Sequence, residues 1–187
     1  MTLDISSPER LSIFRQEAER LNITVAPPDI NVSTALFSAG KKPDGGDVIY
    51  YALSAIRNVG RAAMEHVVEV RDKGGPFKSL FDFARRVDAK FVNRRIMENL
   101  VAAGAFDKLN PNRAQSHAAI DMLLGEANLS SRERESSQVN LFGEVQKQPD
   151  RALPLVDSWT MPDRLAREFA AIGFYMSAHP LDEFKQT

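Results

Sequence analysis

The stretch Tyr51-Ala-Leu-Ser-Ala-Ile-Arg-Asn-Val-Gly60 leads directly into a helical pattern that runs from Arg61 to Asp72. In this stretch a short helical segment from Ser54 is followed by a tight turn at Asn58-Val59-Gly60 and then by the longer helix. The same order recurs over Ser79–Ala103. We therefore predict two successive helical hairpins, and these decide the fold.

The second hairpin carries clear signals for its boundaries. Ser79-Leu-Phe-Asp82 resembles a capping box with Asp in place of Glu, so we expect it to open a short helix that ends near Arg86. A tight segment over residues 88–93 then leads to a helix over Arg94–Ala103, and Gly104 stands where a left-handed helix stop belongs.

The residues before the hairpins predict a small mixed region. Ser7-Pro8 is typical of a helix start, and Leu11, Phe14, Ala18 and Leu21 repeat at helical spacing. After a rigid Pro27-Pro28 connector, residues 32–37 and 48–53 favour two strands joined by a loop rich in Gly, Pro and Asp. We expect these strands to form a short hairpin.

The residues after the hairpins divide into three parts. Asn110-Pro-Asn112 predicts a helix ending near Gly125, and residues 126–159 are polar, which is typical of a flexible linker. Thr160-Met-Pro-Asp163 predicts a last helix, with Gly173 as its stop. The expected fold is mainly α: a small α+β piece over 1–50, a tandem hairpin domain over 51–125, a linker over 126–159 and a helical segment over 160–187.

Composition excludes several classes of protein. The 187 residues include no Cys, which excludes disulfides and thiolate metal sites and fits a reducing cytoplasm. No apolar run reaches the length of a membrane span, so we expect a cytoplasmic protein without a membrane partner. His66, His117 and His179 lack metal-ligand spacing, and Trp159 is interpreted as a packing anchor.

The charge distribution is uneven although the net charge is only −1. Residues 51–100 carry ten Lys and Arg against six Asp and Glu, an excess of four positive charges. A hairpin turn directs backbone N–H groups outward at a helix N-terminus, where the partial positive charge suits a phosphate oxygen. Gly60 would let a phosphate approach closely, and Asn58 tolerates a left-handed turn.

Arg94 and Arg95 lie in the first turn of their expected helix, where cations oppose the helix dipole. An external anion would remove this disadvantage. The alternative interpretation is that both side chains extend into water, where screening removes most of the repulsion. Local sequence slightly favours the alternative.

Several long blocks resemble the alpha subunit of bacterial DNA polymerase III. They are residues 27–31, 51–60, 74–83, 92–107 and 165–182. The resemblance implies a tandem helix-hairpin-helix region that contacts the backbone of template-primer duplex DNA. The residues that it points to are Arg57, Asn58, Val59, Gly60, Arg61, Lys90, Asn93, Arg94 and Arg95.

The resemblance also implies that the catalytic residues lie in another part of the parent polymerase. The parent polymerase is a DNA-directed DNA polymerase whose catalytic carboxylates hold Mg²⁺ in a domain N-terminal to this region, and no match to them is found in this chain. We therefore expect a non-catalytic, cofactor-free segment of a replicative enzyme. Asn58 departs from the Gly that many members have, and its side chain could replace one backbone contact.

Within the expected linker, Gln138-Val-Asn-Leu-Phe142 resembles the family's internal sliding-clamp-binding peptide. Leu141 and Phe142 would each contribute roughly 1.5–3 kcal/mol on burial, and Gln138 would fill a polar subpocket. The implied partners are duplex DNA, the sliding clamp and other polymerase III holoenzyme subunits. The alternative function is a helical scaffold of an error-prone paralogue that makes no direct DNA contact.

Overall fold

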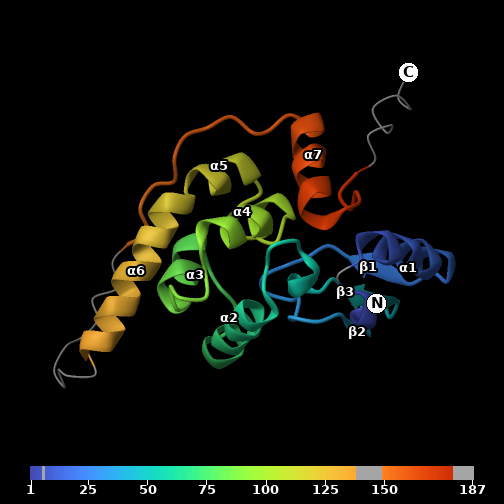
Figure 1. Ribbon diagram of the computed structural model, residues 1–187, viewed down its shortest axis with the longest axis horizontal. Coiled ribbons are helices and arrows are strands. Elements are labelled where there is room, and N and C mark those ends of the chain that lie inside the picture. Colours follow the sequence, from blue (N-terminus) through green and yellow to red (C-terminus); the bar gives the residue numbers. More distant parts are fainter. Residues whose placement is uncertain (6, 138–148, 179–187) are drawn as a thin grey trace.

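The computed structural model describes residues 1–5, 7–137 and 149–178. Within these ranges, seven α-helices surround one core, and a small sheet lies at one end beside the first helix (Figure 1). The helices are α1 (Pro8–Arg20), α2 (Arg61–Gly74), α3 (Leu80–Arg86), α4 (Arg94–Ala102), α5 (Arg113–Ala118), α6 (Ile120–Ser137) and α7 (Met161–Ile172). The mainly helical fold with a small α+β piece is thereby confirmed.

The sheet has the strand order β1-β3-β2, with β1 at Thr24–Ala26, β2 at Ser38–Lys41 and β3 at Asp47–Tyr50. Strands β2 and β3 form the expected antiparallel hairpin, but the prediction of a strand over residues 32–37 is wrong. That region begins with a turn whose carbonyl groups at Ile30 and Ser33 accept hydrogen bonds from the buried guanidinium of Arg71. The parallel strand β1 was not predicted.

The two hairpins form the centre of the molecule. The short 3-10 helix η2 (Leu53–Ala55) precedes α2, and α3 precedes α4 (Figure 1). Their buried side chains meet around an edge-to-face aromatic chain, in which the ring centroids of Phe77 and Phe83 are 5.1 Å apart and those of Phe83 and Phe106 are 5.0 Å apart. Leu53, Met64 and Leu100 are fully buried in the same core. Such burial provides most of the stability of the fold.

The helix starts follow their caps closely. The side chains of Ser79 and Thr160 accept the amides of Asp82 and Asp163, as the sequence predicts. Gly104 and Gly173 adopt left-handed φ values of 82° and 97°. A residue with a side chain would be strained in this conformation. The helix predicted from residue 110 to 125 is instead two helices, α5 and α6, with Ala119 between them.

The prediction of a flexible linker beginning at Glu126 is wrong for its first part, because α6 continues to Ser137. Glu126 and Ala127 are buried, and Glu126 pairs with Arg85 at 2.7 Å. A helix with one short buried side and many charges reads as polar throughout, which explains the error.

Residues 149–160 have no regular structure, but they lie against the helices. Figure 1 shows this orange segment running past α5 on its way to α7. The carbonyls of Pro154 and Val156 accept hydrogen bonds from the side chains of Gln115 and Asn112. Trp159 packs edge-on to His117 and lies under Arg167, whose Cζ is 4.4 Å from the ring centroid, so it acts as the expected anchor. No helix of the described ranges could cross a membrane.

Candidate nucleic-acid interface

The first hairpin turn runs from Arg57 to Gly60 and joins η2 to α2. Asn58 takes a left-handed φ of 61°, which reverses the chain. Val59 is buried, and its amide donates to the carbonyl of Ile56 at 3.1 Å. Val59 therefore packs the turn onto the core, and its amide is already in use.

The N-terminus of α2 is open. Gly60 is the cap residue, its φ of −73° is accessible to any residue, and no side chain caps the helix. A Cβ placed on Gly60 would meet no atom within 4 Å. Neither backbone strain nor packing within the described part of the chain requires glycine here. An external group that approaches the backbone closely would require it.

The amides at this end of α2 are available as donors. Among the described residues, no acceptor receives the amides of Asn58, Gly60 or Arg61. The first turn of α2 also contains no acidic side chain. Such an end combines unsatisfied N–H groups with the positive end of the helix dipole, which favours an anion.

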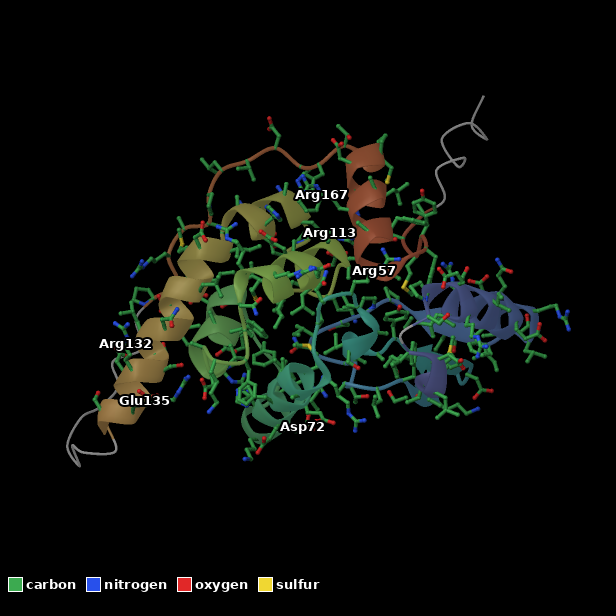
Figure 2. All side chains as sticks on the ribbon, viewed as in Figure 1. Arg57, Asp72, Arg113, Arg132, Glu135 and Arg167 are labelled. Atoms are coloured by element: carbon green, nitrogen blue, oxygen red, sulfur yellow. The ribbon has the colours of Figure 1, made fainter. Side chains whose placement is uncertain are left out.

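Two arginines flank this helix end, Arg57 in the hairpin turn and Arg61 at the start of α2, and their surroundings differ. Arg61 is exposed and pairs with Glu65 at 2.7 Å on the same helix. Arg57 lies at the C-terminal end of α7 (Figure 2). Its backbone amide donates to the carbonyl of Ala171 at 2.8 Å, and its Nη1 donates to the carbonyl of Ala170 at 3.3 Å.

The first part of the second hairpin turn is closed, because the amides of residues 88–91 are all occupied. The amide of Asp88 donates to Nε2 of His66 at 3.0 Å, and the amide of Ala89 donates to Oγ of Ser131 at 3.1 Å. The amides of Lys90 and Phe91 donate to the side chain and the carbonyl of Asp88. A phosphate could use these groups only by displacing the protein's own acceptors.

Helix α6 supplies much of this closure. Besides Ser131, it supplies Arg134, whose guanidinium donates to the carbonyls of Arg85 and Val87 at the end of α3. His66 of α2 stacks on Phe91 with centroids 4.3 Å apart. The sequence pattern did not reveal the roles of His66, Ser131 and Arg134, since each is distant in the chain from the turn that it holds.

The start of α4 is only partly available to an external anion. Asn93 uses its side chain to cap the helix by accepting the amide of Ile96. Arg94 pairs with Glu98 at 3.2 Å and also with Asp121. Arg95 is exposed, and no described residue accepts a hydrogen bond from its guanidinium. Of the two arginines, Arg95 alone combines exposure with an unengaged side chain in the described ranges.

Much of the positive charge of residues 51–100 is engaged within the protein. Lys90 pairs with Asp88 at 2.8 Å and thereby lowers the pKa of that carboxyl. Arg85 contacts Glu126 and Asp150, and Arg86 donates to the carbonyls of Val70 and Gly75. Because Glu126 and Asp150 lie outside residues 51–100, their pairing with Arg85 offsets part of the excess of four positive charges counted in that segment.

The predicted clamp-binding residues Gln138, Leu141 and Phe142 lie outside the described residues. Their assignment stays a prediction. The described chain on either side ends at Ser137 of α6 and resumes at Pro149, next to Asp150.

Comparison with known proteins identifies the family to which the two hairpins belong. A family model described as helix-hairpin-helix motif matches residues 22–116, about half of the chain. The chain belongs to the helix-hairpin-helix motif family. The match includes both turns of the helix-hairpin-helix region and ends within α5, before the α6 residues that close the second turn.

The relatives of this helix-hairpin-helix chain are long polymerases. It is 44% identical over 183 residues to the DNA polymerase III subunit alpha of Caulobacter vibrioides, and 35% identical over 187 residues to that of Vibrio cholerae. The Neisseria meningitidis subunit is 35% identical over 188 residues. Each alignment covers 98% or more of this chain but only 16% of the relative. The resemblance to an internal part of this subunit is confirmed.

Proposed function

We propose that this chain is a non-catalytic, DNA-backbone-binding segment of a replicative DNA polymerase. The observation that carries the proposal is the open N-terminus of α2, where Gly60 leaves free space and neighbouring amides lack acceptors among the described residues. A phosphate oxygen of duplex DNA fits such an end. The helix-hairpin-helix match supports this assignment.

The second hairpin takes a different part in the proposed contact. Because the amides of residues 88–91 are occupied, this turn would contribute mainly side chains, chiefly the exposed Arg95, with Arg94 and Lys90 in secondary roles. Contacts of this kind hold a protein on the duplex without reading bases. Binding should therefore be independent of sequence and should weaken steeply with salt.

A duplex titration tests the proposal. The 187-residue chain is titrated against a fluorescent duplex at low salt, beside Gly60→Glu with Arg95→Glu. The substitutions place two carboxylates where phosphates are proposed to bind, so affinity should fall at least tenfold. Arg20→Glu in α1 is the matched control, since Arg20 is exposed and its one described ion pair is to Glu17 on the same helix. Equal affinity of the double variant and the control would refute the proposal.

We further propose that DNA-directed DNA synthesis, with its Mg²⁺ ions, belongs to other parts of the longer polymerase. The two most deeply buried carboxylates of the described residues are engaged with arginines, Glu126 with Arg85 and Glu168 with Arg113. Within the described residues, no group of three or more acidic or histidine side chains is arranged for a metal ion.

We propose the sliding clamp as a second partner, bound through Gln138, Leu141 and Phe142. The support is the resemblance of the pentapeptide and the family of the relatives. A pull-down of the chain with purified clamp should lose the complex on Leu141→Ala with Phe142→Ala. Leu129→Ala is a suitable control, because Leu129 is an exposed leucine of α6. Undiminished capture of the double variant would remove the clamp assignment.

The scaffold alternative has one specific observation in its favour. Both turns are held from behind by other helices, the first by α7 and the second by α6. A segment that only joins neighbouring domains would show the same supports. The duplex titration decides between the two functions, since a scaffold has no reason to bind DNA with a salt-dependent affinity.

A further inference from the structure

The back of the first hairpin turn rests on the C-terminal end of α7. Arg57 makes both contacts, through its amide to Ala171 and its guanidinium to Ala170. The last carbonyls of a helix carry partial negative charge and lack partners within the helix. Arg57 therefore satisfies groups that α7 would otherwise leave to water.

The fit at this junction is tight. Gly173 ends α7 with a left-handed φ of 97°. A Cβ at this position would lie 3.2 Å from Nη2 of Arg57 and 2.4 Å from Cβ of Pro8 in α1. The end of α7, the side chain of Arg57 and the start of α1 thus meet without space for a methyl group.

Helix α7 is itself fixed on its other side. Glu168 accepts the amides of Met176 and Ser177 at 2.6 and 2.8 Å, which fixes the chain after the helix. The same carboxylate pairs with Arg113 of α5 (Figure 2). The support behind the first turn is therefore connected to the helices that follow the second hairpin.

We propose that Arg57 is a positioning residue, which holds the first hairpin turn on α7, and that it is not a ligand of the DNA phosphate. This changes the role that the sequence resemblance suggests for Arg57, and it rests on the proposed function. The amides of Asn58, Gly60 and Arg61 are the groups that Arg57 sets in place. Helix α7 acts as a brace for the DNA contact.

Salt dependence separates the two roles of an arginine. Each phosphate contact made by a cation contributes about 0.9 to the slope of log affinity against log salt. Removing a positioning residue lowers affinity at every salt concentration but leaves the slope unchanged. Arg57→Gln keeps the backbone bond to Ala171 and loses the side-chain bond to Ala170. We expect duplex affinity to fall about threefold to tenfold, the effect of losing one hydrogen bond, with the wild-type slope.

Arg95→Gln is the comparison, because Arg95 is the exposed cation that the proposed function assigns to a phosphate. For Arg95→Gln, the magnitude of the slope of log affinity against log salt should decrease by about 0.9. A decrease of that size for Arg57→Gln, or unchanged affinity, would overturn the positioning role. If the wild-type chain bound no duplex at low salt, the proposed function itself would fail, and a measurement without DNA then decides the role of Arg57.

That measurement is amide hydrogen exchange in the free chain. Arg57→Gln should speed exchange at the hydrogen-bonded amides of residues 57 and 59 relative to wild type, and Arg95→Gln should not. Gly173→Ala provides a variant that changes no charge: its methyl group displaces α7 from Arg57, so exchange over the same residues should rise and the salt slope should stay constant. Wild-type exchange in both Arg57→Gln and Gly173→Ala would overturn the inference.

Discussion

Arg113 of α5 and Glu168 of α7 form a buried ion pair, with Nη1 and Oε2 3.0 Å apart and side chains that are 5% and 1% exposed. Burial alone would raise the pKa of Glu168, but the amides of Ser177 and Met176 and the guanidinium of Arg113 together lower it. Arg113 also binds Asp107 and the carbonyl of Ala102. The pair therefore joins α7 to the end of α4 through a network of hydrogen bonds.

Replacing Glu168 by Gln should lower the free energy of unfolding by about 3 kcal/mol, because it leaves the buried Arg113 with less compensating charge. Urea denaturation followed by circular dichroism measures this change. Glu19→Gln is the control, since Glu19 pairs with Arg15 at 2.7 Å but its side chain is 52% exposed, and it should cost less than about 1 kcal/mol. A loss in Glu168→Gln no larger than in the control would show that the network is not stabilising.

The backbone of Asn58 leads to a second prediction. At a φ of 61°, a β-branched residue is strained whereas Gly is not. Asn58→Val should therefore cost about 1–2 kcal/mol of stability and weaken duplex binding, and Asn58→Gly should keep both within about 0.5 kcal/mol. Thermal unfolding and the duplex titration provide the values. Asn22, with a φ of 58°, is the matched position away from the hairpins: Asn22→Val should cost stability without affecting DNA affinity.

Much of the fold follows from local signals in the sequence. Ser79, Thr160, Gly104 and Gly173 act through neighbours within four residues, so their positions predict where helices begin and end. Strand β1 gives no such signal, because its three residues become a strand only by pairing with β3. The length of α6 also depends on distant contacts, among them Arg85 with Glu126.

The candidate site likewise combines features that are local in the sequence with features that depend on distant residues. Asn58 and Gly60 are recognisable in the sequence, because the turn and the open helix end are local features. The closure of the second turn is not, since His66 and Ser131 reach it from 22 and 42 residues away in the chain. Charge counting likewise fails for Arg94, because its partner Asp121 lies outside residues 51–100 and comes close only once the helices pack.

His66 should make stability depend on pH. Burial lowers its pKa below the ordinary 6.5, with Asp88 opposing and Lys90 and Arg134 among the weaker influences. A histidine whose pKa is lower in the folded state takes up its proton more readily when unfolded. Its contribution is therefore complete above about pH 6.5 and is lost as the pH falls from there through the folded-state pKa.

His66→Gln tests this dependence, because a glutamine oxygen can still accept the amide of Asp88 but does not titrate. Urea denaturation at pH 7.5 and 5.5 should show a smaller loss of stability in the variant than in wild type. His117→Gln serves as a comparison, since the pKa of His117 is also lowered by burial but its ring lies at Trp159, away from the turn. Only His66→Gln should also reduce the pH dependence of amide exchange at Asp88. An equal pH dependence of amide exchange at Asp88 in wild type, His66→Gln and His117→Gln would contradict the role of His66.

Arg85 joins α6 to the chain that follows residues 138–148. Its Nε pairs with Glu126 near the start of α6 and its Nη1 with Asp150 after the gap, both at 2.7 Å. The two acids differ in burial: the side chain of Glu126 is 8% exposed and that of Asp150 is 43% exposed. The cost of losing each pair should therefore differ.

Arg85→Ala should cost about 3 kcal/mol or more, because among the described residues the buried carboxylate of Glu126 then keeps only Arg151, 4.0 Å away. Asp150→Asn should cost less than about 1 kcal/mol, since an exposed partner is lost and Arg85 keeps Glu126. Urea denaturation of both variants measures this difference. If Asp150→Asn lowered the free energy of unfolding as much as Arg85→Ala, the contact of Arg85 with Asp150 would contribute more to stability than its contact with the buried Glu126.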